Sequence, residues 1–126
     1  IAAPVTDAST RLAIVQDGIA AAARLARREP DAVTLIAVSK TRTAGEIEAL
    51  MGAGQRDFGE SRVQEAEAKW PELRARHPEV RLHCIGRLQS NKADAAVRLF
   101  DTIHSLDRDS LLEALVAAGK KAGRFP

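Results

Sequence analysis

A lysine that closes an apolar run is the residue of this sequence best suited to chemistry. In the stretch LIAVSK, Lys40 follows four apolar residues and a serine. An amine at the end of a buried strand is partly desolvated, which leaves more of it as the free base that attacks an aldehyde. The same position also fits a solvent-facing lysine that merely ends the strand. Lys40 is therefore a candidate anchor for a carbonyl compound, with both interpretations open at this point.

The other patterns that could carry chemistry fail on spacing or geometry. The triplet SKT resembles the end of a phosphate-binding P-loop, but side chains stand where that loop requires glycines. GAGQRD lacks the third glycine of a dinucleotide fingerprint and precedes a predicted strand. His83 and Cys84 are neighbours in a predicted strand, so they face opposite sides and cannot share a metal ion. His104 is interpreted as a hydrogen-bonded core residue, and neither a metal site nor a catalytic residue is predicted.

Hydrophobic periodicity supplies the elements that would position this lysine. Residues 6–28 predict one long amphipathic helix with apolar side chains at helical spacing, namely Leu12, Val15, Ile19, Ala22 and Leu25. Pro30 ends this helix. Aliphatic and β-branched residues over 33–39 then predict a parallel strand that is buried on both faces. Lys40 thus follows the first predicted strand.

The same strand and helix unit recurs along the rest of the chain. Thr43 and Glu46 have the spacing of a capping box, which predicts a short helix that ends at Gly52. Further strands are predicted over 56–60, 80–86 and 101–105, and further helices open at Ser61 and extend over 88–100 and 108–123. Strands that alternate with helices in this way run parallel and are joined by right-handed crossovers.

These units leave two architectures open, a doubly wound sheet and the first half of an eight-stranded barrel. The sequence stops after a helix, where the next strand of a barrel would begin. We therefore expect an α/β fold of the (β/α)8 TIM-barrel class, present as an N-terminal helix plus about four β/α units, a half-barrel fragment. Residues 1–126 are expected to be the N-terminal part of one domain without an internal boundary. Exposed edge strands predict that such a fragment self-associates.

Composition excludes several classes of function. The 126 residues, 45% of them hydrophobic, can bury one core. A net charge of +2 and an aromatic content of 3% predict no nucleic-acid partner. No apolar run reaches the ~20 residues of a membrane span, so no membrane association is expected. The single cysteine, Cys84, predicts a reducing, cytoplasmic location.

A set of motifs gives the sequence a family resemblance. AVSKT, AGQRDFGES, VQEA, IGRLQSNK and IHSLD occur in this order, and the similarity extends over nearly the whole chain. Together they resemble the YggS/PROSC family of pyridoxal phosphate homeostasis proteins. The resemblance implies a barrel similar to the N-terminal domain of alanine racemase. It also implies that pyridoxal 5'-phosphate (PLP) is bound as a Schiff base to the lysine of VSK, which is Lys40 in this chain.

The resemblance implies further cofactor contacts. Ser61 stands where the family usually has the asparagine of FGEN, although Ser61 and Gln64 also fit a capping box. His83 matches a family histidine and is expected to line the mouth of the barrel. Asn91 matches the LQSNK segment, where a structural role at a helix start is equally open. Besides Lys40, the predicted cofactor-binding residues are therefore Ser61, His83 and Asn91.

Three functions remain as hypotheses. The resemblance implies a non-enzymatic PLP-binding protein in PLP homeostasis and amino-acid and keto-acid balance, monomeric at full length, with PLP-dependent apo-enzymes as candidate partners. The second is a PLP-dependent racemase-like enzyme, although this chain has no tyrosine to supply a second acid/base group. The third is an inactive half-barrel fragment, because barrels of this class commonly bind phosphate through the loops after strands seven and eight.

Overall fold

The chain alternates helices with short strands. The computed structural model describes residues 7–126. In chain order its elements are α1 (Ala8–Leu25), η1 (Pro30–Ala32), β1 (Ala37–Val38), α2 (Ala44–Gly52), β2 (Asp57–Glu60), α3 (Val63–Arg76), β3 (Arg81–Cys84), η2 (Ser90–Lys92), α4 (Ala93–Leu99), β4 (Thr102–Ile103) and α5 (Asp109–Ala122). The backbone contacts divide the chain into two compact units. One unit extends to Leu35 and includes Thr43–Gln55, and the other comprises Ile36–Arg42 with Arg56–Pro126.

The second unit contains one parallel sheet of four strands in the order β1-β2-β3-β4. Its registers pair Val38 with Gly59 and Gly59 with His83, so these residues share one face. A strand order that follows the chain without reversal is typical of a singly wound β/α sheet, since a doubly wound sheet reverses at a switch point. The predicted parallel β/α units are confirmed. The sheet is open, which is consistent with part of a barrel but not with a closed one.

β1 is shorter and more exposed than the predicted strand. Only Ala37–Val38 are in strand conformation, whereas the sequence predicts a strand over 33–39. Residues 33–36 before it are not in strand conformation, and Val33 closes the 3-10 turn η1 by donating its amide to the Pro30 carbonyl. Because β1 stands at the edge of the sheet, Val38 is 52% exposed. The prediction of burial on both faces is therefore wrong.

The first unit contains α1 and α2, which pack on each other. Asp7 caps α1 by accepting the Thr10 amide at 2.7 Å. At the start of α2, the Thr43 amide donates to the Glu46 carboxylate and the Glu46 amide donates to the Thr43 hydroxyl. The predicted capping box is therefore confirmed.

The predicted first helix is present, but its apolar stripe is only partly covered. The helix ends at Leu25 rather than residue 28, and residue 6, where the prediction begins, lies outside the described residues. Leu12 is buried, whereas Val15 and Leu25 are exposed. Within its unit, α1 contacts α2 and η1, which are too short to cover the whole stripe. Among residues 7–126, no helix combines the length and apolar character needed to cross a membrane.

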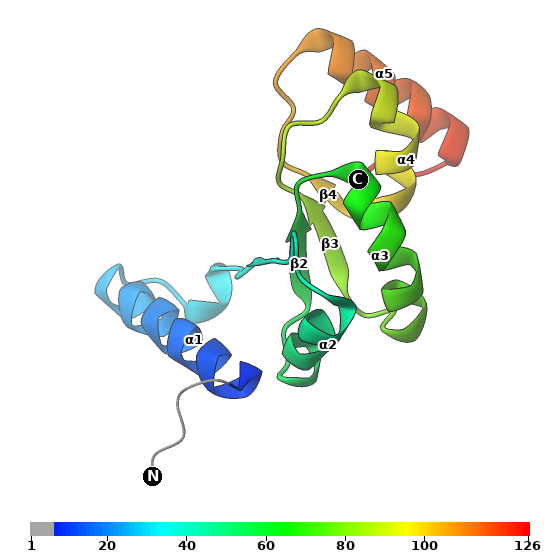
Figure 1. Ribbon diagram of the computed structural model, residues 1–126. Coiled ribbons are helices and arrows are strands. Elements are labelled where there is room, and N and C mark those ends of the chain that lie inside the picture. The colour runs from blue at the N-terminus through cyan, green and yellow to red at the C-terminus, as the bar shows by residue number, and fades with distance from the viewer. Residues whose placement is uncertain (1–6) are drawn as a thin grey trace. The chain divides into compact units, whose positions relative to one another are not determined.

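The core of the second unit lies between the sheet and the helices that follow it. Phe58 of β2 packs on Trp70 of α3 with ring centroids 5.4 Å apart, and both side chains are fully buried. Leu82 of β3, the register partner of Phe58, is also fully buried. Figure 1 shows α3, α4 and α5 following one another beside the sheet, and each packs on the next. Phe58 and Leu82 thus face the helices, while Gly59 and His83 face the opposite side.

A carboxylate fastens the amino end of β4 to the rest of the unit. Asp101 accepts the Leu82 amide at 2.8 Å and pairs with Arg74 of α3 at 2.9 Å. It also pairs with Arg124, close to the end of the chain, at 2.7 Å. Arg124 in turn donates to the Phe100 carbonyl at 2.7 Å. The amino ends of β3 and β4 are therefore held by side chains, and their carboxyl ends remain as the place where β/α folds carry function.

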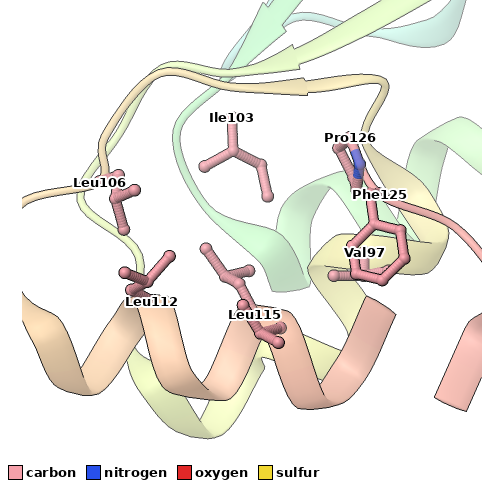
Figure 2. A pocket seen from close by; sticks show the side chains of 8 residues that line it. Val97, Ile103, Leu106, Leu112, Leu115, Phe125 and Pro126 are labelled. Carbon is pink, nitrogen blue, oxygen red and sulfur yellow. The ribbon is translucent and has the colours of Figure 1, made fainter. Parts of the chain in front are cut away.

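An apolar hollow of about 190 Å³ lies beside β4, over the first turns of α5 (Figure 2). Its lining residues are Val97, Ile103, Leu106, Leu112, Leu115, Val116, Phe125 and Pro126. Because this lining has no charged or hydroxyl side chain, the hollow is not a candidate for polar chemistry.

Leu82→Ala should lower the free energy of unfolding by about 2–5 kcal/mol, because it opens a cavity on the buried face of β3. Leu25→Ala, at a side chain that is 89% exposed, is the matched control and should change this free energy by less than about 0.5 kcal/mol. Urea unfolding followed by circular dichroism measures both values. Equal effects of the two substitutions would contradict the assignment of the core.

Candidate functional site

Lys40 lies in a tight turn directly after β1. The turn extends from Ser39 to Arg42 and is closed by the Arg42 amide, which donates to the Ser39 carbonyl oxygen at 3.1 Å. Lys40 is exposed, and its amine has no hydrogen-bond or ion-pair partner among residues 7–126. The structure thus puts the predicted anchor at the carboxyl end of the first strand, with its amine accessible to a carbonyl compound.

The backbone of this turn adopts a conformation that is rare for residues with side chains. Thr41 has a φ angle of 64°, in the left-handed region, where a β-branched residue is strained. A positive φ at the third residue of a four-residue turn is the geometry of a type II turn, which usually has glycine there. The Thr41 amide donates to the Glu65 carboxylate of α3 at 2.5 Å, and its hydroxyl donates to the Lys40 carbonyl at 2.6 Å. Contacts from α3 therefore hold this turn.

Glu60, a fully buried carboxylate at the end of β2, contacts the same segment. Its Oε2 accepts the Ser39 hydroxyl at 2.5 Å and the Trp70 indole N–H at 2.9 Å. The same oxygen pairs with the Lys69 ammonium at 2.9 Å. Its Oε1 has no hydrogen-bond partner among the described residues. A buried charge requires such partners, because its loss of hydration is costly unless donors and a counter-charge replace the water.

Lys69 of α3 connects the buried carboxylate to the turn. Its ammonium donates to the Ser39 carbonyl at 2.9 Å and to the Arg42 carbonyl at 3.2 Å. It also pairs with Glu65, one helical turn earlier, at 3.2 Å. The Lys69 side chain is only 12% exposed. One ammonium therefore binds both ends of the turn that contains Lys40.

Glu65 completes this network at its more exposed end. The hydrogen bond from the Thr41 amide and the contact with Lys69 hold the pKa of the Glu65 carboxyl below its ordinary value, although partial desolvation acts in the opposite direction. Glu65 is therefore a carboxylate throughout the neutral pH range, and it accepts from the strained turn and from Lys69 together.

A second polar cluster lies on the face of the sheet opposite the helices. His83 Nε2 is 2.9 Å from Asp57 Oδ1, and His83 Nδ1 is 3.0 Å from His104 Nε2. Because a carboxylate can only accept, Nε2 of His83 carries a proton in this contact. Arg81 donates twice to the same carboxylate, at 2.8 Å each. The structure thus buries His83 in a cluster that engages both of its ring nitrogens.

His104 differs from its predicted position. β4 ends at Ile103, so His104 lies just beyond the strand and is exposed. Its amide still donates to the Cys84 carbonyl at 3.0 Å, and its ring contacts that of His83. The predicted hydrogen bonding is present, but the predicted core position is wrong because the strand is too short to carry this residue inside.

Ser61 lies where the ends of β2 and β3 approach each other. A Cβ added at Gly86 would lie 2.8 Å from the Cα and Cβ atoms of Ser61, so only glycine fits there. The predicted capping box of Ser61 and Gln64 is wrong. α3 begins one residue later than that pattern requires, with Arg62 as the N-cap residue and no side-chain hydrogen bond to the helix.

The two remaining predicted contacts line different hollows. Ser61 lines a hollow of about 340 Å³ whose basic lining residues are Arg62, Arg87 and Lys92. Asn91, in η2, is exposed and lines a separate hollow bordered by α4 and α5. The structure therefore brings Ser61 close to the basic end of the LQSNK segment but does not bring Asn91 into the same hollow.

The sequence motifs do not single out the residues that hold the Lys40 turn. Two signals for them exist, namely a charged residue at the end of the buried strand DFGE and the i, i+4 spacing of Glu65 and Lys69. Neither signal indicates that Glu60 and Lys69 reach Ser39, which lies 21 and 30 residues earlier in the chain.

Other groups are less suited to chemistry. Among residues 7–126, no cluster of three or more His, Cys, Asp or Glu side chains could hold a metal ion. Cys84 is free and buried, and desolvation raises the pKa of its thiol, which disfavours the nucleophilic thiolate. The amine of Lys40 thus remains the best candidate nucleophile of this region.

No model of a protein family matches the chain. Individual proteins do match it, each over part of its own length. A pyridoxal phosphate homeostasis protein of Synechocystis is 45% identical over 97 residues, which are 77% of this chain and 44% of that protein. The protein of the same name in Escherichia coli is 45% identical over 105 residues, 81% of this chain and 44% of that protein. The chain thus spans about half the length of the curated relatives it matches.

Solved structures also match most of this chain and about half of their own length. PipY of Synechococcus elongatus, in a structure with PLP bound, is 48% identical with a TM-score of 0.72, and the match covers 84% of this chain and 50% of PipY. An unknown protein from Bifidobacterium adolescentis is 38% identical with a TM-score of 0.85, and the match covers 92% of this chain and 51% of that one.

Asp57→Asn should destabilise the chain by about 1–3 kcal/mol at neutral pH, because it removes a charged acceptor from Arg81 and His83. The hydrogen bond from Arg81, then that from His83, holds the pKa of Asp57 below its ordinary value despite desolvation. The carboxylate's contribution is therefore complete above an unfolded-state pKa of about 3.9 and is lost as the pH falls through the lower folded-state value.

Urea unfolding of both proteins between neutral and acidic pH measures this effect. The difference in unfolding free energy should be constant down to about pH 5 and shrink below about pH 4. Glu113→Gln, at an exposed position of α5, is the matched amide substitution and should change little. A difference that grows as the pH falls would contradict the assigned role of Asp57.

Proposed function

We propose that this chain, which belongs to the family of pyridoxal phosphate homeostasis proteins and spans about half their length, binds PLP through Lys40. The ε-amine of Lys40 condenses with the cofactor aldehyde to a Schiff base, and one water molecule leaves. The observation that carries this proposal is an exposed amine without a described partner, in a turn at the carboxyl end of β1. β/α folds present their functional groups at this end of their strands.

The residues of this chain fit the aldehyde end of the cofactor. An imine forms only from the free amine, and the Lys40 amine has no carboxylate partner among residues 7–126 that would stabilise its charged form. When bound, PLP would supply an aldehyde that exchanges reversibly between amines. The basic hollow beside Ser61 offers cations suited to an anionic group. Ser61, His83 and Asn91 stay predicted contacts, of which His83 would act with Asp57 as one hydrogen-bonded unit.

The biological role that we propose is PLP homeostasis without turnover of a substrate. The relatives are named as homeostasis proteins and not as enzymes, which is consistent with this role. Amino-acid and keto-acid balance, PLP-dependent apo-enzymes as partners and a cytoplasmic location are parts of the same proposal. The whole protein would form one β/α-barrel domain of which this chain is part, a proposal supported by the sequential strand order.

Incubation with PLP, reduction with borohydride and peptide mass spectrometry test this function. We expect the added mass on Lys40, because this lysine is exposed and lies just after the carboxyl end of β1. Lys40→Ala should remove most of the label, whereas Lys120→Ala, at an exposed residue of α5, should leave the label on Lys40. Label spread evenly over Lys92, Lys120 and Lys121 would refute the proposed anchor and support an inactive fragment.

A further inference from the structure

We propose that Lys69 is a positioning residue for Lys40, because its ammonium ties both ends of the Ser39–Arg42 turn to the buried Glu60 carboxylate. The inference rests on the proposed function of Lys40 and deepens it by assigning a role to α3. The network would fix the direction in which the turn presents its exposed amine, and it would also decide which of two nearby lysines can react.

The conformation of the turn supports a positioning role for Lys69. Thr41 holds a φ of 64° although a threonine is strained there. Such a residue keeps this conformation only when its surroundings enforce it. Here the Thr41 amide donates to Glu65, and Lys69 binds the carbonyls at both ends of the turn. Release of these contacts would let Thr41 return to negative φ, which reorients the peptide that follows Lys40.

The charges around Lys69 support the same role. Lys69 lies between two carboxylates, 2.9 Å from Glu60 and 3.2 Å from Glu65. Glu60 is fully buried and its Oε1 has no described partner, so the Lys69 ammonium is its counter-charge. Loss of that ammonium would leave a buried carboxylate without a cation. The Lys69 ammonium is thus held between both carboxylates.

The same contacts distinguish the two lysines chemically. The N–H bonds of Lys69 are shared among the Ser39 and Arg42 carbonyls and the two carboxylates. An ammonium bound in this way has no lone pair for attack on an aldehyde. Lys40 has no such partner among residues 7–126. Lys69 therefore positions the anchor and is itself withheld from the reaction.

Two variants disrupt the clamp, which we define as the contacts of Glu60, Glu65 and Lys69 with the Ser39–Arg42 turn. Both are chosen so that the chain still folds. Glu60→Gln combined with Lys69→Met removes both charges together, so that no buried carboxylate is left without a cation. Glu65→Met removes the acceptor of the Thr41 amide at a side chain that is 28% exposed, where the substitution is compatible with folding. Lys121→Met, at a side chain that is 75% exposed, is the matched control.

The first readout is hydrogen exchange of the Thr41 amide, measured by NMR without PLP. Both variants should exchange this amide at least about tenfold faster than the unsubstituted chain. Glu65→Met removes the carboxylate that accepts the Thr41 amide, and the double variant removes the Lys69 ammonium that binds the two carbonyls of the turn. Lys121→Met should leave the exchange rate unchanged. Slow exchange of Thr41 in the two clamp variants would overturn the inference whether or not Lys40 binds PLP.

The second readout is the share of borohydride-trapped PLP on Lys40 relative to that on Lys120. This ratio should fall about tenfold in both clamp variants and stay constant in the Lys121→Met control. A ratio that does not fall in folded clamp variants would overturn the positioning role, even if Thr41 exchanges faster. Absence of label on Lys40 in the unsubstituted chain would refute the proposed function instead, and the exchange rates would then decide the clamp alone.

Discussion

The buried carboxylate of Glu60 is the constraint on which the arrangement around Lys40 depends. A fully desolvated charge requires donors and a cation, and here three groups from two segments supply them: the Ser39 hydroxyl after β1, and the Trp70 indole and the Lys69 ammonium of α3. Lys69 also binds the carbonyls of the turn, so the same ammonium neutralises the Glu60 charge and holds the turn in its conformation. The exposed Lys40 thus lies in a turn that is held by the buried side chains of Ser39 and Glu60 and by the largely buried Lys69.

The two ends of the sheet are organised in different ways. At the amino end of β4, Asp101 binds Arg74, Arg124 and a β3 amide, contacts that join strands to helices. At the carboxyl ends, Glu60 and Lys69 bind a strained turn and leave one amine accessible. This division agrees with the general rule that β/α folds separate stability from function along the strand direction. The Asp57 and His83 cluster lies on the face opposite the helices and extends from Asp57, the first residue of β2, to His104, just beyond β4.

The sequence was informative where local patterns decide the outcome. The alternation of strands and helices predicted the parallel sheet, the TAGE spacing predicted a capping box, and the end of an apolar run predicted the position of Lys40. It was less informative where pairing partners decide. β1 forms only at Ala37–Val38 because it has one neighbouring strand, and His104 falls outside β4 because that strand is short.

The network around Lys40 could not be predicted because its contacts join residues that are far apart in the chain. Nothing near Lys69 indicates that its ammonium reaches the carbonyl of a residue 30 positions earlier. The predicted Ser61 capping box is wrong because α3 starts at Val63, with Arg62 in the N-cap position. Local patterns fixed neither the start of this helix nor the contacts of its side chains.

A crystal structure of the chain grown with PLP would show whether Lys40 is the anchor. We expect continuous electron density from Nζ of Lys40 to the cofactor, with the Lys69 ammonium still bound to Glu60 and to the carbonyls of the turn. Cofactor density joined to Lys69 or to another lysine, with Lys40 unmodified, would contradict it.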